Sequence, residues 1–462
     1  MTIRTRLIIL GTCAVLFLVF APYIVLYSLG YRVDFTNMRL RGTGGIYVYA
    51  VPEPSSILID SKPAEKAKLF STAVFMQNMM PGSHNVLIKK DGYYDYQKNL
   101  LVEEKEVAKL EDVILFKQNV EFTALKNSVN YLFTSLDGNK LLTAKVTARK
   151  IDFEILDLKN NQNQTVSLPV TNGKVSNIIW AQNTTKVILK ISNAYYLLDT
   201  STAKPTVTAL PLLTGVNKIN FNPQDTDQIL FVKNKNLYIS AKTLPVVKDV
   251  VAYTIEGQSI TWLSYDGFLY QSDVTQTQVN KISEKAFGVK TDASYEIRMI
   301  SGVTFLKENN ALFSLHKDLK TFQTFYDNVK NMANSPDNQK ILYYNDHQIL
   351  ISSVEKDHQD KILLNTYTDT IDDCYWLNDH YLVITTGNRI AISEIDNRGN
   401  INKVTLPETI TVDGATPQTK SVLTTNQQII TMKNPKTFFH WQDKKLYVLS
   451  EGNLIVSEKL IP

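Results

Sequence analysis

The residues of this chain best suited to chemistry are two adjacent acids, Asp372 and Asp373, which precede Cys374 and Trp376. Two carboxylates on an inner strand of a ring-shaped domain could coordinate a cation near the axis of the ring. A metal site needs further ligands at suitable spacing, and the sequence offers none beside this pair. We therefore interpret the pair as the solvated end of a strand, and keep both residues as candidates for binding.

Other familiar catalytic patterns are missing from the sequence. None of the histidines belongs to a His-Glu-x-x-His helix or to a Cys/His cluster. The sequence contains neither a Gly-x-Ser-x-Gly elbow nor a Walker loop. We expect no catalytic residue, no metal and no cofactor, and we interpret the histidines as turn or strand residues. They are His84, His316, His347, His358, His380 and His440.

Aromatic residues suggest packing more than ligand binding. Trp180, Trp376 and Trp441 share one position in a repeated pattern, which favours packing between repeats. Trp262 lies outside that register on an alternating strand, and the chain has 23 tyrosines. A face that stacks on carbohydrate is therefore conceivable, and Trp262 is a third candidate binding residue.

The elements that position these residues belong to a repeat that covers residues 118–462. The unit is about 40 residues long and contains about four short strands, which is typical of a β-propeller blade. One such blade cannot bury both of its faces, so the blades must stack into a ring. We count eight blades, with seven as the alternative. They start near residues 127, 171, 214, 250, 286, 329, 368 and 436.

Residues 118–125 are predicted to supply the outer strand of the last blade, which closes the ring and removes its open edges. Residues 409–435 fit no blade and form either an insertion or a degenerate blade. Turns such as Ser335-Pro-Asp337 resemble those of TolB-like and WD40-like propeller repeats. That resemblance implies an architecture and no particular function.

A smaller domain is predicted at residues 45–117, where short β-type runs alternate with turn signals and favour a β-sandwich. The turns resemble those of the PEGA domain of bacterial and archaeal surface proteins. The Pro-Gly-x-His turn at 81–84 and the Lys-x-Gly-Tyr turn at 90–93 match, whereas Pro52-Glu-Pro-Ser55 retains half of the name motif. The resemblance implies a cell-surface accessory domain without catalysis.

Residues 7–30 contain no charged side chain. As a helix they would be about 36 Å long, enough to cross a bilayer core of about 30 Å. A cleaved signal peptide would have a shorter core and a small-x-small site. We therefore expect an uncleaved signal-anchor: residues 1–6 in the cytoplasm, a transmembrane helix at 7–30, a flexible tether at 31–44, and the rest of the chain outside the cell membrane.

The overall charge and the cysteines restrict the classes of function and the type of organism that we expect for this chain. The formal net charge is +4 and no Lys/Arg block occurs, so nothing favours nucleic-acid binding. Cys13 lies in the predicted span and Cys374 in the body, so the two cannot form a disulfide. A large outer region without disulfides suits bacteria better than animals.

Together these features predict an all-β, membrane-anchored cell-surface protein with a non-catalytic binding or scaffold role. Its expected partners are the lipid bilayer, through residues 7–30, and an envelope polysaccharide or surface protein. One alternative is a glycan-active propeller enzyme, which would need two acids facing one pocket. Another is an envelope assembly scaffold that resembles TolB.

Overall fold

The computed structural model describes residues 3–34, 38–64, 73–274, 278–354, 361–413 and 427–462. The chain divides into two compact units. The first unit contains Met1–Val120, Ile392–Leu406 and Leu460–Pro462, and the second contains Glu121–Ala391 and Pro407–Lys459. The assignment of 392–406 to the first unit was not visible in the sequence, because no change in composition marks that segment.

The first unit begins with helix α1 (Ile3–Ser28), none of whose residues is buried. It is long and apolar enough to cross a membrane, with a mean hydropathy of 2.5. Strands β1 (Tyr31–Asp34) and β2 (Arg39–Gly42) follow and pair with each other. The predicted tether at 31–44 thus contains two short strands that satisfy each other's main-chain groups.

Two small sheets then form a β-sandwich, with strand orders β6-β3-β9 and β5-β4-β7-β8. Apolar residues of both sheets make one core, in which Ile46, Val48, Val86 and Ile88 are fully buried. The strands are β3 (Gly44–Val51), β4 (Ser56–Ile59), β5 (Lys62–Pro63), β6 (Val74–Met79), β7 (Gly82–Lys89), β8 (Tyr96–Val102) and β9 (Val107–Ile114).

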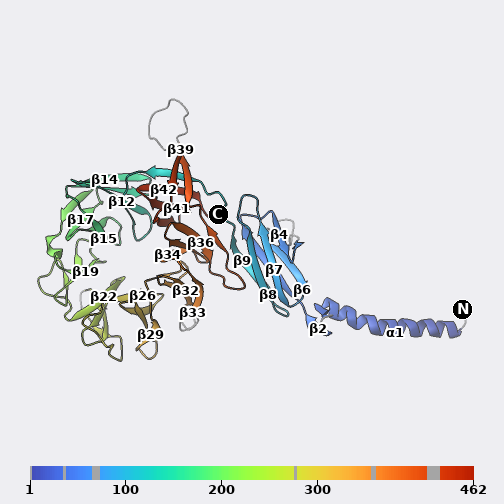
Figure 1. Ribbon diagram of the computed structural model, residues 1–462. Helices are drawn as coiled ribbons and strands as arrows, with labels where there is room; N and C mark the ends of the chain where they lie inside the picture. Colours follow the sequence, from blue (N-terminus) through green and yellow to red (C-terminus); the bar gives the residue numbers. More distant parts are fainter. Residues whose placement is uncertain (1–2, 35–37, 65–72, 275–277, 355–360, 414–426) are drawn as a thin grey trace. The chain divides into compact units, whose positions relative to one another are not determined.

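A β-propeller follows, and its sheets are arranged around an axis in sequence order (Figure 1). Within the described residues there are eight such sheets, which agrees with the predicted blade count. The first four blades are β11–β14 (Tyr131–Thr134, Lys140–Val146, Ile151–Asp157, Gln162–Leu168), β15–β18 (Val175–Trp180, Lys186–Ile191, Ala194–Asp199, Thr206–Ala209), β19–β21 (Asn217–Phe221, Ile229–Lys233, Asn236–Ile239) and β22–β25 (Val250–Glu256, Ser259–Ser264, Leu269–Asp273, Asn280–Lys281).

The next three blades repeat the pattern. They are β26–β29 (Tyr295–Ile300, Val303–Glu308, Ala311–Leu315, Phe322–Tyr326), β30–β33 (Asn331–Asn334, Lys340–Tyr344, Gln348–Ser353, Lys361–Thr366) and β34–β37 (Ile371–Asn378, Tyr381–Thr386, Arg389–Glu394, Lys403–Thr405). A short 3₁₀ helix, η1 (Pro211–Leu213), precedes β19. Successive blades pack through shared apolar clusters, for example Leu142 and Phe153 of one blade with Val187 and Leu189 of the next.

The last blade closes the ring with strands from both ends of the propeller sequence. Its order is β40 (Lys436–His440), β41 (Lys445–Ser450), β42 (Asn453–Lys459) and then β10 (Phe122–Lys126). Phe122 pairs with Ser457 in antiparallel register, which confirms the predicted closure. Strands β38 (Thr409–Asp413) and β39 (Gln427–Thr431) add a hairpin beyond β10. The segment 409–435 is thus an insertion on this blade, although 414–426 lies outside the described residues.

Candidate binding cavity of the propeller

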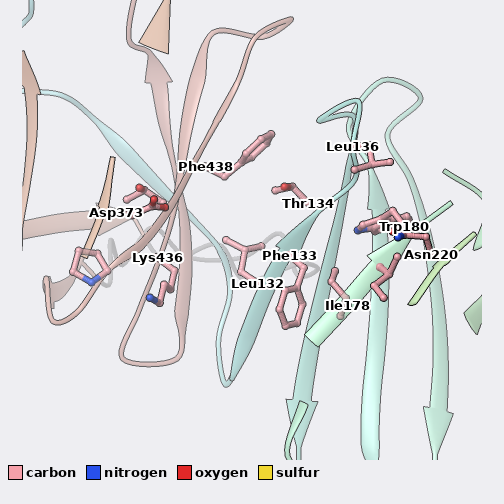
Figure 2. Close-up of a pocket in the computed structure, with 13 residues that line it drawn as sticks. Leu132, Phe133, Thr134, Leu136, Ile178, Trp180, Asn220, Asp373, Lys436 and Phe438 are labelled. Atoms are coloured by element: carbon pink, nitrogen blue, oxygen red, sulfur yellow. The ribbon is translucent and has the colours of Figure 1, made fainter. Parts of the chain in front are cut away.

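The inner strands of the second unit surround a cavity of about 550 Å³. Strands β11, β15, β19, β34 and β40 contribute to it, each the innermost strand of its blade, so the cavity lies beside the axis of the ring. Figure 2 shows the side chains that line it. The residues that line it are Leu132, Phe133, Thr134, Leu136, Ile178, Ile179, Trp180, Asn220, Asp373, Pro435, Lys436, Thr437 and Phe438.

Most of the cavity wall is apolar. Leu132 and Ile178 supply branched aliphatic surface, and Phe133 and Phe438 supply aromatic rings (Figure 2). Hydroxyl and amide groups of Thr134 and Asn220 interrupt this surface. A mostly apolar cavity with a few polar groups is the usual form of a ligand site, since apolar contact gives affinity and polar groups fix orientation.

Trp180 provides the most informative polar group on the wall. It ends β15 and is 6% exposed. Among the described residues its indole Nε1 has no hydrogen-bond partner. A buried donor without an acceptor costs about 1–3 kcal/mol, and an acceptor on a bound molecule would recover that free energy. Trp180 lines the cavity, but this nitrogen itself has less than 1 Å² of accessible surface, so an acceptor on a bound molecule would reach it only after neighbouring side chains move.

The corresponding tryptophan of another blade has an acceptor for the hydrogen bond of its indole N–H. Trp376 pairs with the second residue of β35, as Trp180 pairs with the second residue of β16. The Nε1 of Trp376 donates to the carbonyl oxygen of Ala333, in the preceding blade, at 3.3 Å. The two indoles therefore occupy the same place in the repeat, and they differ in whether the neighbouring blade accepts the hydrogen bond.

Asp373 and Lys436 bring charge to the cavity. The Oδ1 atom of Asp373 accepts hydrogen bonds from the Tyr344 hydroxyl and from its own neighbour's main-chain N–H, that of Cys374, both at 2.9 Å. Burial and then the charge of Asp373 raise the pKa of Tyr344, so its hydroxyl remains a donor. Lys436 is exposed and contributes a cation. The cavity can therefore offer both a positive and a negative group to a ligand.

The predicted acid pair does not act as a pair. Asp373 lines the cavity, whereas Asp372 is not among the lining residues. The Oδ2 atom of Asp372 accepts a hydrogen bond from the N–H of Gly387 at 2.6 Å, in the turn after β35. Within the described part of the chain, no group of three or more His, Cys, Asp or Glu residues could hold a metal ion.

Trp262 lies in the core and not on a binding face. It is on β23 and is 4% exposed. Its ring stacks on that of Tyr270 with centroids 5.7 Å apart. It packs with Tyr253 and Ile260 in the same cluster. A sugar ring needs an exposed aromatic face, so this candidate for carbohydrate stacking is corrected to a packing residue.

The alignment of Trp441 with the other two tryptophans is also corrected. Trp441 is 43% exposed and follows the end of β40. Phe439, which is 2% exposed, pairs with the second residue of β41 and so holds the position of Trp180 and Trp376. The turn between the first two strands differs in length from blade to blade, and this difference shifted the alignment of the sequences.

His84 has a structural role in the first unit. Its Nδ1 atom lies 2.6 Å from Oδ2 of Asp60, and its Nε2 atom lies 2.7 Å from the carbonyl oxygen of Met80. Burial acts to raise the pKa of Asp60, but hydrogen bonds from His84 and Asn85 outweigh it and lower that pKa. The imidazole therefore links two turns at one edge of the sandwich.

Sequence reasoning missed a buried charge cluster in the first unit. Lys98, on β8, is fully buried, and its Nζ atom lies 2.6 Å from Oε1 of Glu394 and 3.5 Å from Oδ2 of Asp396. The Tyr96 hydroxyl donates to Glu394 Oε2 at 2.8 Å, and the Asn402 N–H donates to Oε1 at 2.7 Å. No pattern pointed to this pair, because 296 positions separate Lys98 from Glu394.

Asparagines of the same segment cover the free edge of β8. The N–H groups of Gln97 and Asn99 donate to the side-chain oxygens of Asn402 and Asn400, each at 3.1 Å. The Asn400 amide in turn donates to the carbonyl oxygen of Gln97 at 2.6 Å. An uncovered edge strand invites pairing with another chain, and this contact removes that possibility for β8.

Comparison with known proteins finds no matching family model and no matching curated protein. Solved structures do resemble the chain at low identity. The structure of Kluyveromyces lactis Hsv2 has 12% identity and a TM-score of 0.39, and the match covers 61% of this chain and 100% of that one.

Two further solved structures give similar figures. The Cps50 (Swd1) beta-propeller domain of Myceliophteria thermophila has 9% identity and a TM-score of 0.38, over 72% of this chain and 98% of that chain. A eukaryotic initiation factor has 10% identity and a TM-score of 0.44, over 72% and 86% of the two chains. At these scores the likeness carries no argument about function, and the propeller assignment rests on the sheets of the chain itself.

Proposed function

We propose that this protein is a membrane-anchored, non-catalytic binding protein that holds a segment of a protein partner in the axial cavity of its propeller. The observation that carries this proposal is the mostly apolar cavity of about 550 Å³, whose wall also holds the polar groups of Thr134, Asn220 and Asp373. A bound segment that displaces the side chains covering Trp180 Nε1 would also supply the acceptor that this donor lacks among the described residues.

The chemistry of the wall favours a protein segment over a sugar polymer. Leu132, Ile178 and Pro435 present aliphatic surface, which suits apolar side chains. Trp262, which the sequence suggested for carbohydrate stacking, is 4% exposed and does not line the cavity. The main-chain carbonyls of an extended peptide would supply acceptors at regular intervals.

Helix α1 supports the membrane part of the proposal. None of its residues is buried, and side chains such as Leu18 and Phe17 are each 70% exposed. Exposing that much apolar surface to water would cost about 25 cal/mol for each Å², which lipid contact would avoid. With Arg4 and Arg6 ahead of the span, we place the N-terminus in the cytoplasm and residues 31–462 outside.

A bacterial cell-surface location and a relationship to PEGA domains remain predictions from the turn motifs. The sandwich at residues 45–117 would then act as an accessory domain between the membrane and the propeller. This part of the proposal does not depend on the cavity, and the experiment below tests the cavity by itself.

Site-specific photocrosslinking in native membranes tests the cavity. A benzophenone amino acid replaces Phe133 or Phe438 in the full chain, and in a control it replaces Leu319, which is 58% exposed in the turn after β28. We expect a protein adduct of defined mass from both cavity positions and none from position 319. Adding the Trp180→Phe substitution should lower the yield of the adduct.

The outcomes separate the partner classes. An adduct whose added mass is removed by glycosidases would replace the protein partner by an envelope polysaccharide. Equal labelling from positions 133, 438 and 319, or no labelling at all, would show that the cavity is not a binding site.

A further inference from the structure

The hairpin of β1 and β2 follows the apolar helix almost directly. Gly30 makes the connection, with a φ of +84° that a side chain would disfavour. Its carbonyl oxygen accepts hydrogen bonds from the Thr43 N–H at 2.8 Å and from the Thr43 hydroxyl at 2.6 Å. The hairpin is thus closed at its base, right at the end of α1.

The two faces of the hairpin differ in chemistry. In the register of the pair, Val33 lies opposite Leu40, so these side chains share one face. Val33 is 36% exposed and Leu40 is 56% exposed, and the nearby Met38 is 81% exposed. Arg32 and Arg41 lie opposite each other on the other face. A small hairpin with one apolar and one charged face is suited to the boundary between lipid acyl chains and water.

Arg32 fixes this hairpin to the end of the helix. Its Nη1 atom donates to the carbonyl oxygens of Tyr27 at 2.8 Å and Tyr31 at 2.9 Å. Its guanidinium lies over the Tyr27 ring, 3.5 Å from the ring centre. These contacts satisfy a carbonyl at the C-terminus of the helix and place a cation there, which the helix dipole favours.

The residues around this junction are those found where a helix leaves a bilayer. Tyr23 and Tyr27 are 55% and 51% exposed on the last turns of α1. Tyrosines at this level form the aromatic belt of membrane proteins, where one end of the ring is apolar and the other is wet. Arginines beside them are suited to lipid phosphates.

The charges near the hairpin are mixed. Arg41 pairs with Glu104 at 2.8 Å and lies 3.9 Å from Asp34. The hydrogen bond from Arg41 lowers the pKa of Glu104. Lys105 lies over the Tyr31 ring at 5.1 Å. With Arg32 and Arg39 the cations outnumber Asp34 and Glu104 by two, which would favour an anionic surface. Charge does not account for the exposed apolar face, whereas insertion of that face does.

We propose that this hairpin lies in the headgroup region of the bilayer, with Val33, Met38 and Leu40 inserted toward the acyl chains. The occupant of the apolar face is the phospholipid surface itself, because α1 delivers the hairpin to that surface. The inference rests on the membrane span that we proposed above. It adds a second contact with lipid, which would limit how far the sandwich tilts from the membrane.

The test uses the full chain in nanodiscs of phosphatidylcholine and phosphatidylglycerol, with lipids that carry a doxyl quencher. An environment-sensitive fluorophore is attached at one cysteine at a time. The natural Cys13 is exposed on α1 and reports the span, whereas Cys374 is buried and does not react in the folded chain. In a Cys13→Ser background, Leu40→Cys reports the hairpin, and Leu244→Cys, which is 76% exposed in the propeller at the wild-type residue, is the control.

We expect strong quenching at position 13, clear quenching with a blue shift at position 40, and none at position 244. Quenching at 13 with none at 40 would overturn the hairpin inference and leave the membrane span intact. No quenching at 13 would overturn both. A fluorophore at position 40 that is quenched only in discs rich in phosphatidylglycerol would show surface attraction and not insertion, which also contradicts the inference.

Discussion

The two units each bury polar groups, but they differ in whether the hydrogen bonds of those groups are complete. In the first unit, Lys98 meets Glu394 and Asp396, and Glu394 also accepts a hydrogen bond from Tyr96. In the second unit, the indole of Trp180 ends at the cavity without an acceptor among the described residues. A complete cluster holds a segment in place, whereas an incomplete one leaves free energy for a ligand to recover.

Breaking the complete cluster should have the largest effect. Lys98→Met leaves the carboxylate of Glu394 buried without its cation, so we expect the free energy of unfolding of the first unit to fall by about 3–5 kcal/mol. Urea unfolding of the detergent-solubilised chain measures this change. Lys89→Met is the matched control, because Lys89 pairs with Asp95 at 3.1 Å on the exposed surface, where a pair contributes about 0–1 kcal/mol.

A double variant sharpens this prediction. Glu394→Gln removes the negative charge, so Lys98→Met combined with Glu394→Gln should recover part of the loss. If Lys98→Met costs no more than Lys89→Met, the cluster contributes nothing to the fold and the comparison fails.

Gly399→Ala should detach the segment that covers β8. A Cβ atom at Gly399 would lie 2.2 Å from the carbonyl oxygen of Asn99, and the φ of +68° adds strain. We expect a loss of about 2–3 kcal/mol from this strain and from broken hydrogen bonds. Hydrogen exchange should accelerate at the amides of Gln97 and Asn99, which donate to the asparagines of that segment.

Gly257→Ala controls for strain alone. Gly257 has a φ of +55°, and a Cβ atom there would meet no described atom within 4 Å. Its substitution should cost about 1 kcal/mol and leave exchange at Gln97 and Asn99 unchanged. Slow exchange at β8 in Gly399→Ala would mean that the edge is protected by something other than the segment.

Trp180→Phe should separate binding from stability. It removes the unsatisfied donor and keeps an aromatic ring, so we expect little loss of stability and a fall in partner affinity of about fivefold. Trp376→Phe should do the opposite, because it removes the hydrogen bond to Ala333. Thermal unfolding and crosslinking yield, measured on both variants, test this reversal. The same response from both would remove the distinction between the two indoles.

Lys218 contrasts with Lys98, because its effect on stability should depend on pH. The Nζ atom of Lys218 donates to the carbonyl oxygens of Val251 at 2.6 Å and Tyr295 at 2.8 Å. Lys98 instead pairs with carboxylates. Burial, against the charge of Glu296, lowers the pKa of Lys218 to about 8. An unfolded lysine titrates near about 10.4. Between these values the unfolded chain binds more protons, so the free energy of unfolding should rise with pH.

Lys218→Gln tests that sign. It keeps a hydrogen-bond donor and removes the titration, so the rise between about pH 8 and pH 10 should shrink relative to the original chain. Parallel pH profiles of the two proteins would show that Lys218 does not titrate differently in the folded state.

The sequence predicted those features that repeat or lie close together along the chain. Blade starts followed from a period of about 40 residues, and closure by β10 followed from one unpaired strand ahead of the first blade. The Trp441 alignment failed because a turn of variable length sits between the compared positions. The β1–β2 hairpin was missed because strands of four residues among glycines and arginines give no clear alternation.

Only a small part of the binding cavity could be predicted from the sequence. Asp373 was selected for its acidity, and the structure places it on the wall. Phe133, Ile178 and Phe438 have no distinctive pattern, because any inner strand carries such residues. These side chains converge because of the order of the blades around the axis. The spacing of strands in the sequence does not show which side chain of an inner strand faces the cavity.

The pairing of β10 with β42 also sets an order of events during synthesis. Strand β10 is made before the first blade, but its antiparallel neighbour, with Ser457 opposite Phe122, is made after the seventh. A nascent chain can build its blades one after another while the seam stays open. The ring can therefore close only after β42 has left the ribosome, and until then the edge of β10 that faces β42 needs protection from pairing with other chains.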